Sequence, residues 1–579
     1  MKAEPMTQPL PADILLSVQN LSVDFPLRTS TLHAVRDVSF ELHRGETLCL
    51  VGESGSGKSV TARSVMRIVD KPGRLVGGRI LLNLDTETRD LAALQPNDHR
   101  VRAIRGARIG FIFQEPMSAL SPLYTIGAQI DEAIQLHLKL DKQAARARTI
   151  DLLGKVEIPD PARMADRYSF EFSGGMRQRV CIAMALACNP DILIADEPTT
   201  ALDVTTQADI LDLIKRLQTE RGMAMLLITH DMGVVAEVAT DVAVMQNGAI
   251  VEQGPVDAIF HAPQHPYTRR LLAATLKLET KADTAPALPV DTEVQPVLSI
   301  RNLGKTYGGA SSLLGRKSYA LKAVDDVSLD LYPGENLGIV GESGSGKTTL
   351  GRLILRVVEP TSGSVHYRQR DGETIDVGRL DRQGLKRFHA DVRLIFQDPF
   401  GSLNPRMNVK RIVGDPLYIN GLAKGRALEH RVAELLQLVG IDPAAMERYP
   451  HAFSGGQRQR IGIARALALD PRIIIADEAT SALDVSIRSQ ILDLLLDLQR
   501  RLDLSFIFIS HDISVVRYFC DRVAVMHRGK VVEIGDAETI CSAPSQSYTK
   551  ALISAVPNPD PRNKRMLHRV RFEADAQTD

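Results

Sequence analysis

A glycine-rich stretch has the composition of a phosphate-binding loop. Gly52-Glu53-Ser54-Gly55-Ser56-Gly57-Lys58-Ser59 fits the spacing G-x-x-x-x-G-K-[S/T]. Glycines let backbone N–H groups close around phosphate oxygens, and the helix that follows adds positive potential at its N-terminus. We expect Lys58 to reach the β- and γ-phosphates and the Ser59 hydroxyl to bind Mg²⁺. Gly341-Glu342-Ser343-Gly344-Ser345-Gly346-Lys347-Thr348 repeats the pattern, which disfavours a chance match.

Paired carboxylates end an apolar run in each half of the chain. Asp196 and Glu197 follow Ile192-Leu193-Ile194-Ala195, and the second half repeats the pattern with Asp477 and Glu478. Because adjacent residues on a strand point to opposite faces, the two acids can do different work. We expect the aspartates to face Mg²⁺ and the glutamates to act as general bases on a water molecule.

Two further polar residues recur in the same order. Gln114 and Gln397 each follow a β-rich apolar run, which suggests a strand that presents an amide to the nucleotide. His230 and His511 follow a later apolar run and are placed to hydrogen-bond a γ-phosphate. A single glutamine is usually a solvated loop residue and a lone histidine is more often structural. The repetition favours the functional interpretation in both cases.

A serine and two glycines precede a helical pattern in each half. Ser173-Gly174-Gly175 and Ser454-Gly455-Gly456 have the composition of a second anion-binding nest at a helix start. Each half also opens with an alternating run that ends in an aromatic residue, Phe25 or Tyr307. These rings could stack on adenine or could be core residues, and the pattern alone does not decide between the two.

The elements that must position these residues follow from periodicity. Glu46–Val51 is expected to be a buried strand that enters the first glycine-rich loop, and apolar spacing over Val60–Val69 predicts the helix that leaves it. The stretches 128–158 and 424–441 are expected to be helical. They would form a small helical subdomain between the loop and the serine–glycine motif of each half.

Internal repetition sets the domain organisation. The motifs from Phe172 to Thr268 recur at a constant offset of 281 residues, in the same order. The sequence therefore predicts two copies of one α/β domain, over residues 1–276 and 297–579. The segment 277–296 is rich in Ala, Pro, Thr and Asp without clear periodicity, and we expect it to be a linker.

Composition narrows the class of protein. The chain has 579 residues, 44% of them hydrophobic, with 70 basic and 70 acidic residues, so no dominant attraction to nucleic acid is expected. Its five cysteines form no C-x-x-C pattern, which suggests neither a zinc module nor a disulfide framework. Residues 1–13 lack the long apolar run of a signal peptide, and no window has the 18 apolar residues expected of a membrane span.

Together these motifs resemble the ATP-binding-cassette (ABC) superfamily. The resemblance implies an α/β fold of two tandem ABC-type P-loop NTPase domains. Each would have a RecA-like core, an antiparallel β subdomain and a helical signature subdomain. It also implies head-to-tail docking, in which Lys58 shares an ATP site with Ser454–Gly456 and Lys347 shares one with Ser173–Gly175. Met176 stands where the signature more commonly has glutamine.

The resemblance assigns residues to ATP, Mg²⁺ and catalysis. The catalytic set is Glu197, Glu478, His230, His511, Gln114 and Gln397. The Mg²⁺ set is Ser59, Gln114, Asp196, Thr348, Gln397 and Asp477. The ATP-binding set comprises the two loops with Val60 and Thr349, the two serine–glycine motifs, Phe25 and Tyr307.

Within the superfamily the chain is similar to the peptide/nickel/opine import ATPases. The similarity lies in Gln114–Pro122, Gln397–Pro405 and His261–Thr268. It implies an ATPase that drives import of peptide-like solutes, such as glutathione and di- or oligopeptides. The expected partners are two transmembrane permease subunits and an extracytoplasmic substrate-binding protein. The expected location is the cytoplasmic face of the bacterial inner membrane, with no nucleic acid bound and no iron–sulfur cluster.

Alternatives remain at this point. A ribosome-associated translation factor with two cassettes would typically carry a long charged helical linker, whereas 277–296 is short and contains proline. A DNA-repair ATPase would carry zinc-binding cysteines. The basic tail, which includes Arg562, Arg565 and Arg569, could contact lipid headgroups or be a solvated end, and the solvated end is the expectation.

Overall fold

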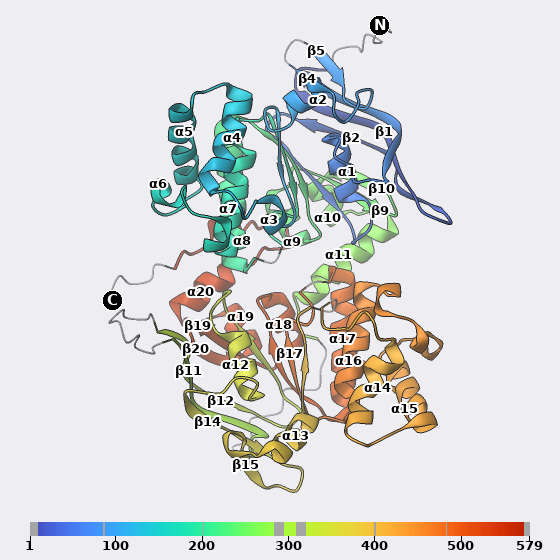
Figure 1. Cartoon of the computed structure of the whole chain (residues 1–579), viewed down its shortest axis with the longest axis vertical. Coiled ribbons are helices and arrows are strands. Elements are labelled where there is room, and N and C mark those ends of the chain that lie inside the picture. The colour runs from blue at the N-terminus through green and yellow to red at the C-terminus, as the bar shows by residue number, and fades with distance from the viewer. Residues whose placement is uncertain are drawn as a thin grey trace. The chain divides into compact units, whose positions relative to one another are not determined.

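Two compact units make up the chain. The computed structural model describes residues 10–84, 87–200, 202–282, 294–308, 320–398, 401–481 and 483–572. The first unit contains Met1–Thr275 and Ala555–Arg569, and the second contains Leu276–Ser554 and Val570–Asp579 (Figure 1). The sequence did not predict that Ala555–Arg569 lies with the first unit. The domain boundaries at 276 and 296 stay a prediction.

The core of the first unit is a six-stranded sheet in the order β10-β9-β3-β8-β7-β6. Strands β3, β8, β7 and β6 run parallel, and β9 is parallel to β3, whereas β10 is antiparallel to β9. Every residue of β3, β7 and β8 is buried, as is typical of parallel strands covered on both faces. The bounds are β3 (Thr47–Val51), β6 (Ile109–Ile112), β7 (Ile192–Asp196), β8 (Ala224–Ile228), β9 (Asp241–Gln246) and β10 (Ala249–Pro255).

A second, antiparallel sheet of the first unit has the order β2-β1-β4-β5. Its alternating burial reflects one face packed on the core and one facing solvent. Its strands contribute to the same apolar cluster as α1 and one face of the central sheet. The bounds are β1 (Ile14–Pro26), β2 (Thr31–His43), β4 (Arg74–Leu84) and β5 (Glu87–Asp90).

The helices of the first unit include the predicted helical subdomain. The stretch predicted over 128–158 is divided into α4 and α5, because Lys139 adopts a left-handed conformation and Asp141 caps α5. These two helices pack with α7 around a shared apolar cluster. The bounds are α1 (Lys58–Val65), α2 (His99–Ile104), α3 (Pro116–Ala119), α4 (Ile126–Leu138), α5 (Lys142–Lys155), α6 (Pro161–Met164), α7 (Gly174–Ala185), α8 (Val204–Arg221), α9 (Met232–Val238), α10 (Val256–His261) and α11 (Pro266–Leu278).

The second unit repeats both sheets, in the orders β16-β17-β18-β13-β19-β20 and β12-β11-β14-β15. Its strands are β11 (Leu298–Tyr307), β12 (Leu321–Leu331), β13 (Asn336–Val340), β14 (Ser362–Arg368), β15 (Thr374–Asp376), β16 (Val392–Ile395), β17 (Ile473–Asp477), β18 (Ser505–Ile509), β19 (Arg522–His527) and β20 (Lys530–Asp536). Its helices are α12 (Lys347–Ile354), α13 (Arg382–Asp391), α14 (Val409–Ile419), α15 (Gly425–Leu438), α16 (Gly455–Leu467), α17 (Val485–Leu502), α18 (Ile513–Phe519), α19 (Ala537–Ser542) and α20 (Ser547–Ser554).

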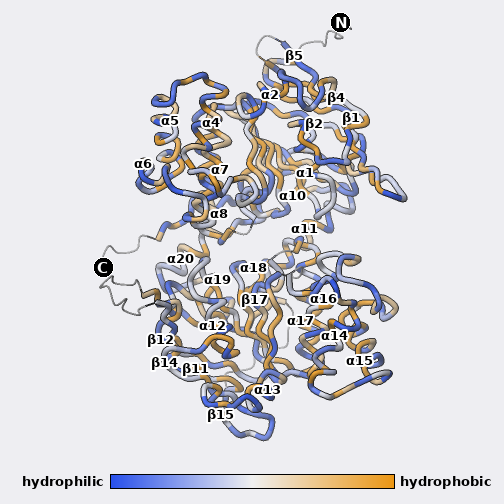
Figure 2. The backbone as a smooth tube through the Cα atoms, in the orientation of Figure 1, coloured by the Kyte–Doolittle hydropathy of each residue, from blue (hydrophilic) through white to orange (hydrophobic). Residues whose placement is uncertain are grey.

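The α/β class, the antiparallel subdomain and the helical subdomain are confirmed in both units. Figure 2 shows the apolar residues concentrated on the central strands of each unit. The helix predicted to reach Val69 ends earlier, at Val65, because Arg67 adopts a left-handed conformation. Of the predicted linker, Lys277 and Leu278 belong to α11, and 283–293 lies outside the described residues. Across the described ranges, no helix combines the length and apolar character needed to cross a membrane.

Candidate active site

The first glycine-rich loop lies between β3 and α1, as predicted. Its backbone depends on glycine at two positions in particular, because Gly52 has φ 146° and Gly57 has φ 102°. A Cβ on Gly52 would lie 2.2 Å from the Met245 carbonyl oxygen. A Cβ on Gly57 would lie 2.4 Å from the Ala34 carbonyl oxygen. Backbone atoms of two neighbouring segments therefore lie against the loop, and a side chain at either position would require the backbone to move.

Lys58 begins α1 and folds back over the loop. Its Nζ donates to the carbonyl oxygens of Gly52, at 2.6 Å, and Glu53, at 2.9 Å. The Lys58 side chain is buried within the unit. An ammonium group fixed inside a ring of backbone groups is placed to meet a phosphate that enters the loop. Val60, also predicted as an ATP contact, lies in the same first turn of the helix.

Ser59 and Asp196, two of the residues predicted to bind Mg²⁺, contact each other. The Ser59 hydroxyl donates to Asp196 Oδ1 at 2.9 Å, and Asp196 is buried at the end of β7. Burial raises the pKa of Asp196 above its usual value, and the hydrogen bond from Ser59 partly offsets this rise. A buried carboxylate beside a hydroxyl is a donor set that suits a hard divalent cation such as Mg²⁺.

Glu197 is the centre of a polar cluster. Its carboxylate accepts hydrogen bonds from Gln114 Nε2, at 2.9 Å, and from the Thr200 hydroxyl, at 2.8 Å. His230 Nδ1 lies 3.1 Å from the other carboxylate oxygen. Burial by itself would raise the pKa of Glu197, but the contact with His230 and the remaining favourable interactions outweigh it and lower the pKa to about 2. The structure thus holds Glu197 as a carboxylate near neutral pH.

Asp196 and Glu197 point in different directions, but alternation along a strand, which predicted this, is not the cause. Strand β7 ends at Asp196, and Glu197 has φ 47°, in the left-handed region. The backbone turn, rather than the strand pleat, directs the glutamate toward Gln114 and His230. Non-glycine residues in this region cluster at functional sites, where surrounding contacts maintain the strain.

The second unit builds the same cluster. Lys347 Nζ donates to the carbonyl oxygens of Gly341 and Glu342, each at 2.8 Å, and the Thr348 hydroxyl donates to Asp477 at 3.2 Å. The glutamate of the pair, with φ 47°, accepts from a glutamine amide at 2.6 Å and lies 3.3 Å from a histidine nitrogen; these residues are Glu478, Gln397 and His511. Burial raises the pKa of Asp477, whereas the contact with His511 leads the interactions that lower the pKa of Glu478 despite its burial. Thr349 lies in the first turn of α12.

The serine–glycine motifs occupy helix N-termini, as predicted. Ser173 caps α7 by accepting from the Met176 amide, and Ser454 caps α16 by accepting from the Gln457 amide. Only in the second unit does the residue three positions on return a hydrogen bond, from the Ser454 amide to Gln457 Oε1 at 3.1 Å. Methionine has no group that can accept this bond. The two signature helices therefore begin differently.

Met176→Gln is expected to complete the capping box of α7 and to stabilise it by about 0.5–1 kcal/mol. Hydrogen exchange of the first-turn amides should slow, and the reverse change Gln457→Met should speed exchange in α16. Equal exchange in both variants and the parent chain would contradict the assignment.

The two predicted adenine-stacking residues lie in different surroundings. Phe25 is partly buried and packs against the apolar cluster of the first unit. Tyr307 is 42% exposed, with Lys305 Nζ 5.2 Å from its ring centroid. Among the described residues, neither ring contacts the glycine-rich loop, so stacking stays a prediction. Ala201 and Ala482, in the turns after the acidic pairs, lie outside the described residues.

Two tyrosines contact the glycine-rich loops and were not predicted to do so. The Tyr267 hydroxyl accepts from the Glu53 amide at 2.9 Å, and the Tyr548 hydroxyl accepts from the Glu342 amide at 3.2 Å. Both rings are buried. One sequence feature could have indicated these contacts. The pair Tyr-Thr recurs at the 281-residue offset, at the end of both copies of the domain.

Tyr267→Phe is expected to raise the Kd for ATP by about two- to ten-fold, because it removes one net hydrogen bond that orients the loop. Titration with a fluorescent ATP analogue would measure the change. Tyr124→Phe serves as the matched control, since Tyr124 is 63% exposed. An unchanged Kd in Tyr267→Phe would show that the contact does not orient the loop.

Two protein-family models match both halves of the chain. A family model described as ABC transporter matches residues 35–200 and 324–481. A second model, the C-terminal region of oligopeptide/dipeptide transporters, matches residues 251–307 and 532–578. The dimeric post-hydrolysis structure of the ATP-binding cassette MJ0796, bound to ADP and Pi, is 30% identical, with a TM-score of 0.36. The match to this structure covers 42% of the present chain and 98% of the MJ0796 chain.

Curated relatives match almost the whole chain. The glutathione import ATP-binding protein GsiA of Escherichia coli (strain K12) is 49% identical over 97% of this chain and 92% of its own length. The protein of the same name from Shigella dysenteriae has the same identity and coverage. With two P-loop clusters, the matched family model and these relatives, the chain belongs to the ABC transporter family as one of its ATP-binding, ATP-hydrolysing proteins.

Proposed function

We propose that this chain is the ATPase subunit of an importer for peptide-like solutes, with glutathione and di- or oligopeptides as the solute class. The observation that carries the proposal is the 49% identity to glutathione import ATP-binding proteins over 97% of the chain. The match to the oligopeptide/dipeptide transporter C-terminal region in both halves supports the same solute class.

The contacts of the site residues support a role for each of them. Lys58 and Lys347 bind the β- and γ-phosphates, together with the loop amides. Ser59 and Asp196, with Thr348 and Asp477, would hold Mg²⁺, and Gln114 and Gln397 would complete its shell. When bound, Mg²⁺ would neutralise charge on the phosphates. Ser173–Gly175 and Ser454–Gly456 supply further amides for phosphate oxygens.

Hydrolysis depends on the glutamate clusters. Glu197 and Glu478, held ionised, accept a proton from the attacking water as it approaches the γ-phosphate. His230 and His511 lie beside these carboxylates, where their rings orient the glutamates and would hydrogen-bond the γ-phosphate. The glutamine amides contact the same carboxylates, so the orientation of each glutamate depends on the loop that follows β6 or β16.

The partners proposed are two membrane permease subunits and an extracytoplasmic substrate-binding protein, with the chain at the cytoplasmic face of the bacterial inner membrane. The import proteins among the relatives and the match to the oligopeptide/dipeptide transporter region support this proposal. The alternative of a ribosome-associated factor gains no support from the relatives, which are named as import proteins.

Affinity purification from native cells, followed by reconstitution in proteoliposomes, tests the proposal. Two multi-span permease chains should copurify, and ATP with a matching binding protein should drive uptake of radiolabelled glutathione or peptide. The chain carrying Lys58→Ala and Lys347→Ala is the control for uptake. Copurification of ribosomal proteins without a permease would overturn the transport assignment and leave the ATPase intact.

A further inference from the structure

The segment Ala555–Arg569 leaves the second unit and returns to it. At its base, the Ser554 hydroxyl accepts from the Val570 amide at 3.0 Å and donates to the Val570 carbonyl at 3.3 Å. Phe572 then packs edge-on against His527 and Tyr548 of the second unit. The residues between these anchors belong to the first unit. We call Ala555–Arg569 the strap.

Apolar residues of the strap are part of the first unit's core. Ala555 is 1% exposed and Met566 is fully buried, and both belong to the apolar cluster formed by the central sheet and helices of the first unit. Leu567 packs against the same cluster. The strap thus removes apolar surface from water on a unit to which it is not adjacent in sequence.

A buried carboxylate of the first unit binds the strap backbone. Glu237, near the end of α9, is 1% exposed, and its Oε1 accepts from the Asn558 amide at 3.2 Å and the Met566 amide at 2.9 Å. Its hydrogen bonds within the described part of the chain all come from these two strap amides. Burying a carboxylate is costly unless it is hydrogen-bonded, so this position is built to receive the strap.

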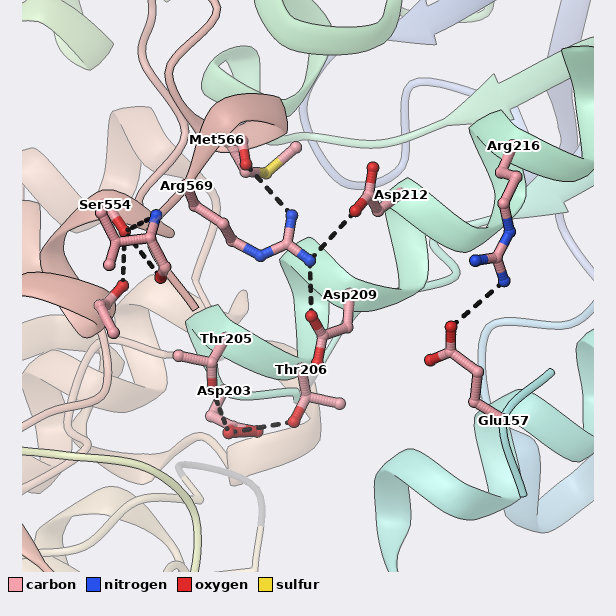
Figure 3. A network of polar contacts seen from close by, with 12 residues as sticks. Glu157, Asp203, Thr205, Thr206, Asp209, Asp212, Arg216, Ser554, Met566 and Arg569 are labelled. Atoms are coloured by element: carbon pink, nitrogen blue, oxygen red, sulfur yellow. Dashed lines mark hydrogen bonds and ion pairs between the residues drawn. The ribbon is translucent and has the colours of Figure 1, made fainter. Parts of the chain in front are cut away.

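Arginine side chains of the strap meet aspartates of the first unit. The Arg569 side chain is 5% exposed, and its Nη2 lies 2.5 Å from Asp209 and 3.3 Å from Asp212, both on α8 (Figure 3). Arg562 makes a bidentate pair with Asp257 at 2.6 and 2.8 Å. The expectation of a solvated basic tail is therefore wrong for Arg569, because no sequence pattern links it to an acidic partner 360 positions away.

The second unit holds the other strap-like segment at the equivalent place. The end of α11 and the residues after it contact α17 and α18: Lys277 lies 2.6 Å from Asp493, and the Ser514 hydroxyl donates to Glu279 at 3.0 Å. At the 281-residue offset, Asp493 corresponds to Asp212. The second unit therefore binds the end of α11 and the segment after it on α17 and α18. In the same way, the first unit binds the strap on the corresponding helices α8 and α9.

The helices bound by the strap follow catalytic motifs of the first unit. Helix α8 begins directly after Asp203 in the turn that follows the acidic pair, and α9 begins two residues after His230. Asp209 also lies 3.8 Å from Arg179 on the signature helix α7. Arg569 therefore contacts a carboxylate shared with the signature helix, and Glu237 ties the strap to the helix after the histidine.

We infer that the first unit carries a built docking site for the strap, and that Arg569 is a positioning residue through which the strap fixes α8 and α9 during ATP hydrolysis. The site's occupant is a segment of this same chain, recognised by buried apolar residues, two backbone amides and two arginines. The inference concerns ATP hydrolysis and does not depend on the identity of the imported solute.

Docking is tested by crosslinking in the full chain. Asp257→Cys with Arg562→Cys, treated with a short bis-maleimide, is expected to give a crosslinked peptide detectable by mass spectrometry. The native cysteines should react slowly, since burial raises the pKa of each thiol. Asp257→Cys with Lys564→Cys tests geometric specificity and should crosslink less. Absence of the first crosslink in folded protein would overturn the docking site.

Positioning is tested by kinetics. Arg569→Ala is expected to lower kcat for ATP about two- to ten-fold while KM for ATP stays within two-fold, because Arg569 acts through α8. Arg569→Lys should restore part of kcat, and Lys564→Ala, which removes an exposed charge from the strap, should match the parent chain. Asp209→Ala combined with Arg569→Ala should be less than additive. An unchanged kcat in Arg569→Ala, with the crosslink present, would overturn the positioning role.

Discussion

Replacing Glu197 and Glu478 together by glutamine is expected to lower kcat for ATP hydrolysis about 10²- to 10⁴-fold while ATP still binds. Glutamine keeps the size of each side chain and its ability to accept from Gln114 or Gln397, but it cannot take a proton from water. The lysine and loop amides that bind phosphate are unchanged. Bound ATP should therefore persist, and steady-state phosphate release should fall to near background.

Single-turnover and steady-state phosphate release, together with ATP retention on a filter, would measure this result. A matched control is Glu220→Gln with Glu373→Gln, because both glutamates are exposed and belong to no site described above. The single variants Glu197→Gln and Glu478→Gln show whether the two sites turn over independently, in which case each would retain about half of kcat. Turnover at the parent rate in the double variant would refute the general-base assignment.

More of the candidate site's residues than of its long-range contacts could be predicted from the sequence. Loop, carboxylate, glutamine and histidine motifs are local strings whose composition is imposed by phosphate and water, so each could be found by residue type and spacing. The contact of Tyr267 with Glu53 spans 214 positions, and nothing at either end reveals the other. The same holds for Glu237, which resembles an ordinary helical surface glutamate until the strap covers it.

Backbone conformation also lay beyond the sequence. Alternation along a strand predicted that Asp196 and Glu197 would point apart, and they contact different residues for another reason, the left-handed turn at Glu197. Glutamate has no intrinsic preference for that conformation. Only surrounding contacts, such as those with Thr200 and His230, can hold it there, and those contacts arise from the assembled sheet.

Gly52→Ala is expected to weaken ATP binding far more than Gly55→Ala, although both lie in the same loop. A Cβ on Gly52 meets the Met245 carbonyl oxygen at 2.2 Å, and φ 146° is nearly closed to alanine. Gly55 has φ 79° with nothing within 4 Å of its Cβ position, so alanine there costs only the left-handed conformation, about 1 kcal/mol. The strain at Gly52 is expected to add about 1–3 kcal/mol.

Equilibrium titration with ATP would compare these variants, and the pair Gly341→Ala and Gly344→Ala provides an internal repeat in the second unit. There, a Cβ on Gly341 meets the Met526 carbonyl at 2.2 Å, whereas Gly344 has open space. Urea unfolding separates a local loop effect from loss of the fold. Equal losses at Gly52 and Gly55 would mean that the loop needs flexibility at every glycine. A large loss confined to Gly52 and Gly341 would mean that the loop needs the backbone conformation and the close packing against the neighbouring strand that these two positions combine, because they differ from Gly55 and Gly344 both in φ and in what surrounds them.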